Sequence, residues 1–292
     1  MTAFLRLWLL AARPRTLPAA IVPVLVGTAL AARVRFQWPL FIATLAVSLL
    51  IQIGTNYAND VFDFLKGADQ ARRGPQRVTQ SGLVSPRQMI AATASVFGAA
   101  ALLGLTLASV AGWLLVVVGA LAMAAGLAYT GGPWPLGYHG LGDLFVFVFF
   151  GVVAVSGSYY VQAGEVSAAA LAASAPVGLL VTAILVVNNL RDIESDRAAG
   201  KRTLAVRIGA RATRVQFDLL VGAAYTVPLL MWLAGMSGGL FWLPWLSLPW
   251  AARLVRDVYR AGDSPSLIRA LGRTAQLHLG YGVLFALSLL LV

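Results

Sequence analysis

Apolar segments of about 15 to 23 residues follow one another along almost the whole chain, separated by short loops that hold most of the charged residues. They predict about nine membrane-spanning helices, at 17–33, 39–57, 86–108, 110–130, 141–162, 168–190, 212–234, 238–252 and 272–292. The eighth segment is short and contains Pro244 and Pro249. Because a spanning helix takes about 20 residues, nine helices leave no room for a second, soluble domain. We therefore expect residues 1–292 to form a single all-α polytopic membrane domain.

The composition also indicates that the solvent of this chain is a bilayer. The chain is 59% hydrophobic and 11% charged, with a mean hydropathy of +0.81, which excludes an ordinary soluble globular domain. It has no cysteine, so disulfides and thiolate-ligated zinc or iron–sulfur sites are excluded. The two histidines, His139 and His278, are far apart in sequence and form no metal-binding motif.

The net charge of +11 would fit a nucleic-acid-binding protein, but the positions of the charges argue against that function. If the N-terminus is cytoplasmic, every Lys and Arg except Arg33 and Arg35 falls in a cytoplasmic segment of the predicted topology. This distribution obeys the positive-inside rule and predicts a cytoplasmic N-terminus. The basic charge then reflects topology and contact with anionic membrane lipid, with no nucleic-acid partner.

A short polar pattern occurs twice, each time at the end of an apolar segment. The first copy, in NYANDVFD, contains Asn56, Asp60 and Asp63; the second, in NNLRDIESD, contains Asn188, Asp192 and Asp196. Spacings of three and four place side chains on one face of a helix. The predicted helices two and six run in the same direction, so both motifs lie at cytoplasmic ends. The repeat predicts two parallel halves, about 17–130 and 141–252, followed by a ninth helix at 272–292.

Each acidic motif is followed by cations, which points to a metal–diphosphate site. Lys66, Arg72, Arg73 and Arg77 follow the first motif, and Lys201 and Arg202 follow the second. Mg²⁺ binds carboxylates and phosphate oxygens, and Lys and Arg bind the remaining phosphate charge. The plainer alternative is a pair of solvated loops, because runs of charge usually face water. Asn56 and Asn188 argue against it, since a polar group inside an apolar run is costly without a partner.

A Gly- and Pro-rich stretch, AYTGGPWPLGYHGLGDLFVFVFFG, lies between the two motifs. Tyr129 ends the predicted fourth helix, and Asp143 begins the fifth, which is rich in aromatic residues. Aromatic ring faces can stabilise a carbocation by cation–π attraction. Aromatic residues in membrane helices are equally often packing or interfacial residues, so this stretch alone leaves both functions open.

Taken together, these residues resemble a known family. ARPRTLPAAIVPVLVGTALA, NDVFDFLKGAD, GPQRVTQSG, the Gly/Pro-rich stretch, NNLRDIESDRAAGKRTLAVRIG and LGRTAQLHL are similar to segments of the UbiA-type intramembrane prenyltransferases. The resemblance covers the chain from about residue 12 to its C-terminus. The paired Asp motifs are typical of the whole superfamily. VTQSG and the Gly/Pro-rich stretch resemble the branch that prenylates 1,4-dihydroxy-2-naphthoate.

The resemblance implies a fold and a set of site residues. It implies nine helices around a central cavity whose cytoplasmic mouth is capped by the two Asp-bearing loops. Mg²⁺ would be bound by Asp60 and Asp63 on one side and by Asp192 and Asp196 on the other, bridging a prenyl diphosphate. The remaining implied residues support this site: Asn56 and Asn188 beside the metal, Arg77 and Lys201 on the diphosphate, and Tyr129 near the reacting carbon.

The sequence departs from the superfamily pattern at one position. Many members carry a lysine four residues after the tyrosine that matches Tyr129, and here that position is Pro133. Another cation must then replace this lysine, and Arg72 and Arg73 are the candidates that the sequence offers.

The activity implied by the resemblance is Mg²⁺-dependent transfer of a polyprenyl group from polyprenyl diphosphate to 1,4-dihydroxy-2-naphthoate. The acceptor loses its carboxylate as CO₂ and gives a demethylmenaquinone, the quinone precursor of menaquinone biosynthesis. The implied location is the plasma membrane, with the active site open toward the cytoplasm. Two alternatives stay open: another aromatic acceptor, such as 4-hydroxybenzoate or homogentisate, and a cation-coupled transporter. Acids at helix ends and a parallel repeat argue against transport.

Overall fold

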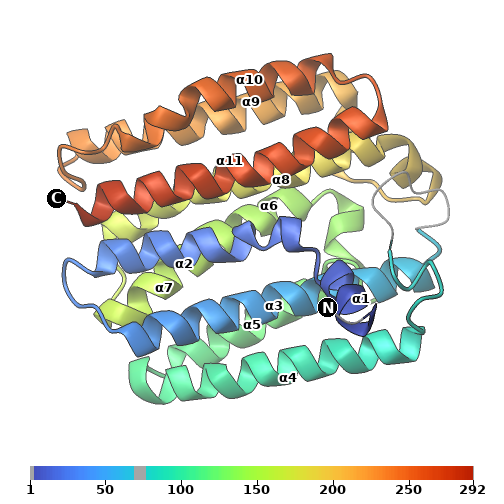
Figure 1. Ribbon diagram of the computed structural model, residues 1–292, viewed down its shortest axis with the longest axis horizontal. Coiled ribbons are helices and arrows are strands. Elements are labelled where there is room, and N and C mark those ends of the chain that lie inside the picture. The colour runs from blue at the N-terminus through green and yellow to red at the C-terminus, as the bar shows by residue number, and fades with distance from the viewer. Residues whose placement is uncertain (1–2, 69–76, 292) are drawn as a thin grey trace.

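The computed structural model describes residues 3–68 and 77–291, and every regular element in these ranges is a helix (Figure 1). The elements are α1 (Ala3–Ala12), η1 (Pro14–Thr16), α2 (Pro18–Ala31), α3 (Trp38–Leu65), α4 (Pro86–Ala111), α5 (Leu114–Ala128), η2 (Leu136–His139), α6 (Gly142–Val146), η3 (Phe147–Val153), α7 (Ala154–Ala163), α8 (Ala168–Ala198), α9 (Leu204–Leu233), η4 (Leu243–Ser247), α10 (Leu248–Arg260) and α11 (Ser264–Leu290). The prediction of an all-α fold is confirmed.

The long helices lie side by side along one axis of the molecule (Figure 1). Helix α8 packs against α9, α3 against α4, and α2 against both α11 and α7. Glycines allow the closest contacts: at Gly27 of α2 there is no room for a Cβ beside the carbonyl oxygen of Val155 on α7. Small residues at such crossings are how helices gain contact area in a bilayer, where the lipid provides no hydrophobic driving force for association.

Five helices of the described chain are long and apolar enough to cross a membrane, namely 38–65, 86–111, 142–163 (α6, η3 and α7 together), 168–198 and 204–233. A sixth is formed if 5–16 and 18–31, which meet at an angle of 55°, count as one span. These helices establish a multi-pass membrane protein. The full set of nine spans stays a prediction.

The eighth predicted span, 238–252, was wrong in its bounds. Helical structure there begins at Leu243 with η4 and continues through α10 to Arg260. Pro244 and Pro249 do not interrupt this segment, because each lies in the first turn of its helix. Proline suits that position because its missing N–H would have no intrahelical partner there.

The two helices that carry the acidic motifs extend beyond their apolar segments. Helix α3 continues to Leu65 and α8 to Ala198, so the aspartates lie in their last turns. Gly67 (φ 69°) and Gly200 (φ 74°) follow in the left-handed region, where glycine is strongly favoured. These breaks release the chain into the loops that complete the site.

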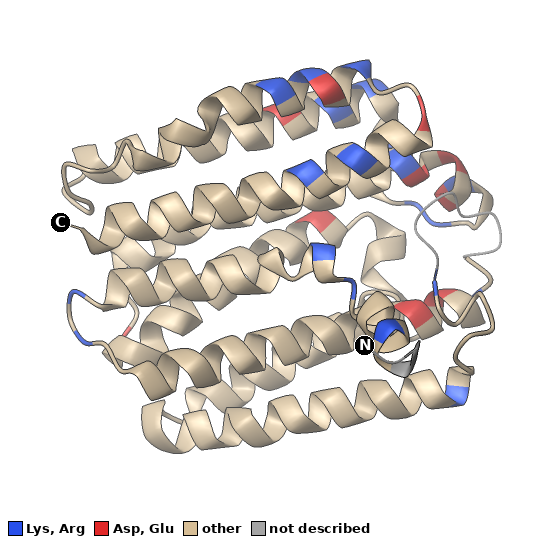
Figure 2. Ribbon diagram, in the orientation of Figure 1, with Lys and Arg blue, Asp and Glu red and all other residues tan. Residues whose placement is uncertain are grey.

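Charge gathers at one end of the helical bundle. Figure 2 shows acidic and basic residues concentrated at the end of the bundle that contains the carboxyl-terminal ends of α3, α8 and α10 and the amino-terminal end of α11. The opposite end holds few. The basic residues at that opposite end lie in the loop between α2 and α3, which contains Arg33 and Arg35. The motif-bearing ends of α3 and α8 are therefore both at the charged end of the molecule.

Candidate active site

A cavity of about 620 Å³ runs between the helices from the charged end into the apolar interior. This volume lies in the usual range for a small-molecule site. Among the residues predicted for the site, those that line the cavity are Asn56, Asp63, Arg77, Tyr129, Asn188, Asp192, Asp196 and Lys201. One cavity thus brings together both acidic motifs, the Gly/Pro-rich stretch and the cations that follow the motifs.

Asp63 lies at the centre of a network drawn from three other segments. It is almost fully buried, and its Oδ2 accepts a hydrogen bond of 2.8 Å from Arg77. Its Oδ1 accepts bonds of 2.9 Å from both Lys201 Nζ and the hydroxyl of Tyr138. A carboxylate has about four acceptor positions, so these three partners leave room for one more ligand. Asp63 therefore joins the end of α3 to the loops after α3, α5 and α8.

Asp60 has a different environment from Asp63. Its side chain is buried, and its Oδ1 accepts a hydrogen bond of 3.1 Å from the backbone N–H of Thr79. It is not among the described residues that line the cavity. In this structure Asp60 holds the VTQSG segment against α3.

The second motif is held within its own helix. The side chain of Arg191 donates to both oxygens of Asp192, with Nε–Oδ1 and NH2–Oδ2 distances of 2.7 and 2.5 Å. The same NH2 group also donates to Asn188 Oδ1 at 2.9 Å. Arg191 is buried, so this charge-assisted pair is well shielded from solvent. Asp196 lies one turn further along α8, half-buried at the cavity wall.

Two lysines approach the ring of Tyr138 beside Asp63. Lys66 Nζ is 5.2 Å and Lys201 Nζ is 4.7 Å from the ring centroid, both within cation–π range. Lys66 Nζ also donates to the carbonyl oxygen of Gly132 at 2.9 Å. Partial burial is the main cause that lowers the pKa of the Lys66 ammonium; Asp63 opposes this shift, and the charge of Lys201 adds to it. The site thus concentrates positive charge next to its acids, as a polyanionic ligand requires.

Asn56 is oriented by its own hydrogen bonds. Its Nδ2 donates to the carbonyl oxygen of Ala12 at 2.9 Å and to Thr16 Oγ1 at 3.0 Å. Both amide hydrogens are therefore used, and Oδ1 is the group that Asn56 can offer to a ligand. An amide oxygen suits a metal ion or a metal-bound water better than a phosphate oxygen.

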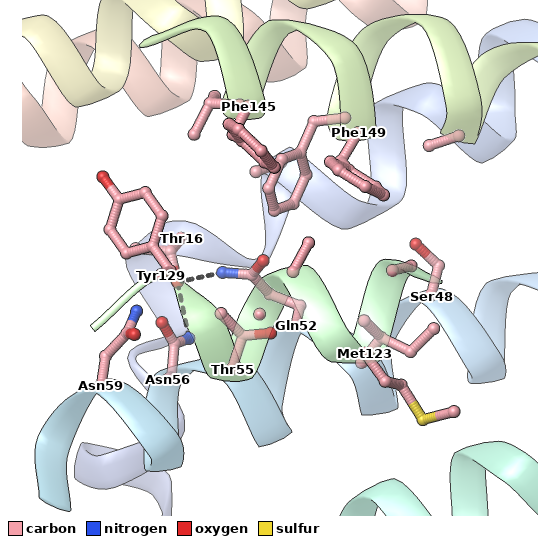
Figure 3. Close-up of a pocket in the computed structure, with 18 of the residues that line it drawn as sticks. Thr16, Ser48, Gln52, Thr55, Asn56, Asn59, Met123, Tyr129, Phe145 and Phe149 are labelled. Carbon is pink, nitrogen blue, oxygen red and sulfur yellow. Dashed lines mark hydrogen bonds between the residues drawn. The ribbon is translucent and has the colours of Figure 1, made fainter. Parts of the chain in front are cut away.

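The deeper part of the cavity is apolar and aromatic. Tyr129 follows the last residue of α5 and lies near the polar end, while Phe145 and Phe149 come from α6 and η3. The two phenylalanine rings are stacked with centroids 5.9 Å apart (Figure 3). This wall excludes water from the space beyond the polar end.

Arg72 and Arg73, the predicted replacements for the superfamily lysine, lie outside the described residues. Within 3–68 and 77–291, no group of three His, Cys, Asp or Glu side chains is close enough to hold a metal ion. The metal-ligand roles predicted for Asp60, Asp63, Asp192 and Asp196 therefore stay predictions.

Sequence reasoning missed two residues of the site, Tyr138 and Arg191. Tyr138 stood in the Gly/Pro-rich stretch without a helical spacing to mark its role, and only the folded loop brings it to Asp63. Arg191 had a signal, because it is an arginine directly beside a motif aspartate near the end of an apolar segment. A charge in that position needs a partner, and Asp192 is the nearest one.

Comparison with known proteins gives a consistent result. The model of the UbiA prenyltransferase family matches residues 20–271. The chain is similar to a 1,4-dihydroxy-2-naphthoate octaprenyltransferase of Mycobacterium tuberculosis, with 44% identity over 78% of each chain. It is also similar to the 1,4-dihydroxy-2-naphthoate octaprenyltransferase of Escherichia coli, with 39% identity over 97% of this chain and 95% of the relative.

A solved structure shares the fold. It is a UbiA homolog from Archaeoglobus fulgidus bound to GPP and Mg²⁺, with a TM-score of 0.68 and 13% identity over 98% of this chain and 100% of the other. At that identity the similarity concerns the fold alone. The resemblance predicted from the motifs is confirmed by the family match.

Proposed function

Because the chain belongs to the UbiA prenyltransferase family, we propose that it transfers a polyprenyl group from polyprenyl diphosphate to 1,4-dihydroxy-2-naphthoate. Release of diphosphate and loss of CO₂ from the acceptor then give a demethylmenaquinol, the reduced form of demethylmenaquinone, which places the enzyme in menaquinone biosynthesis. The relatives with 44% and 39% identity carry this activity in their names. The observation that carries the proposal is one cavity with acids and cations at one end and an aromatic, apolar wall beyond them.

The polar end of the cavity fits a diphosphate with Mg²⁺. Asp63, Asp192 and Asp196 offer carboxylates, and Asn56 and Asn188 offer amide oxygens, which is the oxygen-rich donor set that Mg²⁺ prefers. A fold neighbour was solved with GPP and Mg²⁺. When bound, Mg²⁺ would neutralise the diphosphate and help it to leave. We include Asp60 in this site as the partner that fixes the VTQSG segment.

Cations around Asp63 bind the diphosphate in this proposal. Arg77 and Lys201 already lie at 2.8 and 2.9 Å from Asp63 and line the cavity. Lys66 takes the place of the superfamily lysine that Pro133 replaces, because its ammonium binds the carbonyl oxygen of the adjacent Gly132. Arg72 and Arg73 remain candidates for the same role. Positive charge held in place before the reaction stabilises the leaving group as negative charge develops on it.

The apolar part of the cavity receives the prenyl chain and protects the reacting carbon. As the allylic C–O bond breaks, positive charge develops on the prenyl carbon, and the faces of Phe145, Phe149 and Tyr129 stabilise it. The same wall keeps water from capturing the carbon before the acceptor ring attacks it. Arg13 lines the cavity directly before η1, and its guanidinium binds the carboxylate of the acceptor in this proposal.

The proposal includes the membrane topology. Nine spans, a cytoplasmic N-terminus and parallel halves at about 17–130 and 141–252 place the site at the cytoplasmic face of the plasma membrane. The gathering of charge at one end of the bundle supports this orientation (Figure 2). A cavity that opens there meets its charged substrates from the cytoplasm and takes the prenyl chain from the bilayer, with membrane lipid as its surroundings.

An acceptor panel tests the function. Purified protein in nanodiscs is incubated with Mg²⁺, a labelled polyprenyl diphosphate, and 1,4-dihydroxy-2-naphthoate, 4-hydroxybenzoate or homogentisate. The expected result is prenylation of dihydroxynaphthoate with release of CO₂, lost on chelation and restored by Mg²⁺. Product from another acceptor alone would support aromatic prenyl transfer but refute a role in menaquinone biosynthesis. If no acceptor gives product and liposomes show cation flux without any prenyl substrate, the protein is a transporter.

A further inference from the structure

A row of polar side chains on α3 continues below the acidic motif into the apolar part of the cavity. Gln52 lies one turn before Asn56 on the same helix face, about 6 Å deeper along the axis. Gln52 is 6% exposed, and its Oε1 is a buried atom without a hydrogen-bond partner. A buried acceptor of this kind is uncommon in a folded protein and requires an explanation. None of the groups assigned to the diphosphate or the metal includes Gln52.

Thr16 determines which way the Gln52 amide faces. The Thr16 hydroxyl donates its only hydrogen to the carbonyl oxygen of Arg13 at 2.9 Å. Its oxygen can then only accept, and it accepts from Gln52 Nε2 at 3.1 Å and from Asn56 Nδ2 at 3.0 Å. The alternative amide orientation would place two acceptors against each other. The network therefore directs the Gln52 oxygen away from Thr16.

The opposite wall of the cavity is aromatic. Figure 3 shows the Gln52 oxygen on the side of α3 that faces Phe145 and Phe149, with the Gln52 nitrogen directed toward Thr16. The two phenylalanine rings are inclined by 18° to each other. The part of the cavity between Gln52 and these rings has the Gln52 oxygen as a hydrogen-bond acceptor at one edge and apolar ring faces at another. Such a space fits a flat aromatic molecule that has a hydroxyl group on its rim.

We propose that Gln52 is a specificity-determining residue for the aromatic acceptor, with Oε1 accepting a hydrogen bond from a ring hydroxyl. This inference rests on the proposed function, because it assigns the acceptor subsite of the same cavity. The contact fixes the acceptor ring against Phe145 and Phe149 and below the diphosphate. It also polarises the hydroxyl, which increases the electron density of the ring that attacks the prenyl carbon. An acceptor without a hydroxyl in that position leaves the Gln52 oxygen unpaired and is rejected.

Kinetics of a Gln52→Met variant test this role. Methionine keeps the length of the side chain and removes both polar groups. We expect the KM for 1,4-dihydroxy-2-naphthoate to rise about tenfold or more and the KM for polyprenyl diphosphate to change less than about twofold. Gln88→Met is the matched control, because it makes the same change at an exposed glutamine at the start of α4 that does not line the cavity. This control should leave both KM values close to those of the wild type.

Competitive inhibition by the two mono-O-methyl ethers of the acceptor provides a readout that does not depend on the variant folding. In the wild type, the ether that blocks the bound hydroxyl should inhibit about tenfold more weakly than the other ether. Gln52→Met should remove this difference. Equal inhibition by both ethers in the wild type would overturn the proposal, as would an unchanged acceptor KM in a folded Gln52→Met variant. Absence of product from every acceptor in the wild type would instead refute the proposed function itself.

Discussion

The two acidic motifs look alike in sequence but are held in the structure by different means. Asp63 of the first motif is bound by Arg77, Tyr138 and Lys201, which come from three different segments outside its own helix. Asp192 of the second motif is bound by Arg191, its neighbour on α8. The first aspartate is therefore a tertiary crosslink between loops, whereas the second belongs to a local pair. Repeated motifs can share a chemical role and still contribute unequally to stability.

The largest effects are expected from replacing each aspartate by asparagine, which separates its chemical role from its contribution to stability. Asp63→Asn and Asp192→Asn should each lower product formation by about 100-fold or more, because each removes a charge aimed at the metal–diphosphate end. Asp63→Asn should also lower the free energy of unfolding by about 3 kcal/mol or more, since it leaves two buried cations, Arg77 and Lys201, beside a neutral group. Asp192→Asn should lower it less, since it leaves one buried cation, Arg191. Thermal unfolding in detergent and a product assay on the same preparations measure both quantities.

The comparison fails if the two variants unfold at the same temperature. Equal destabilisation would show that Asp63 is no more a crosslink than Asp192. Asp257→Asn is a control for the loss of any aspartate, because Asp257 pairs with Arg273 on the surface and its exposed ion pair should contribute less than about 1 kcal/mol.

An intermediate effect is expected from Arg191→Lys. Lysine keeps the positive charge but cannot bind both oxygens of Asp192 and Asn188 Oδ1 in the same geometry. We expect product formation to fall about tenfold, which corresponds to about 1.4 kcal/mol, with little change in thermal unfolding. If Arg197→Lys, a conservative change at an exposed site on the same helix, reduced the rate as much, the bidentate contact would not be the cause.

The smallest expected effect tests the role of Lys66 in binding the diphosphate. Lys66→Met removes the ammonium that binds Gly132, and product formation should fall about threefold to tenfold, since other cations remain at the diphosphate end. Adding Pro133→Lys to this variant should recover part of the lost rate by returning a cation to the superfamily position. A double variant that is slower than Lys66→Met would contradict the proposal that Lys66 supplies the cation that other members carry at position 133.

The sequence was sufficient for the parts of this molecule that depend on local pattern. Hydrophobic runs identified the long helices, and the motifs at the ends of two apolar segments lie near the ends of α3 and α8. Gly67 and Gly200 follow the ends of these helices, where a left-handed residue is a local requirement. The bounds of the eighth segment were wrong because a proline at the first turn of a helix and a proline that breaks one look the same in sequence.

The contacts that assemble the site could not be predicted in this way. Tyr138 meets Asp63, and Lys66 meets Gly132, only after loops distant in sequence have closed over the end of α3. No spacing rule joins residues so far apart. In the sequence, Gln52 is one polar residue in an apolar helix. Only the hydrogen bonds of Thr16 in the folded protein show that the Gln52 oxygen, and not its nitrogen, is available to a ligand.

The bend of 55° between the amino-terminal helix and α2 has a practical consequence. The bend brings the carbonyl oxygen of Ala12, at the end of α1, to the side chain of Asn56. The amino-terminal segment therefore orients a side chain of the proposed active site, and trimming it for expression should lower turnover before it lowers stability. An affinity tag belongs at the other terminus, which lies at the end of the bundle opposite the charged groups (Figures 1 and 2).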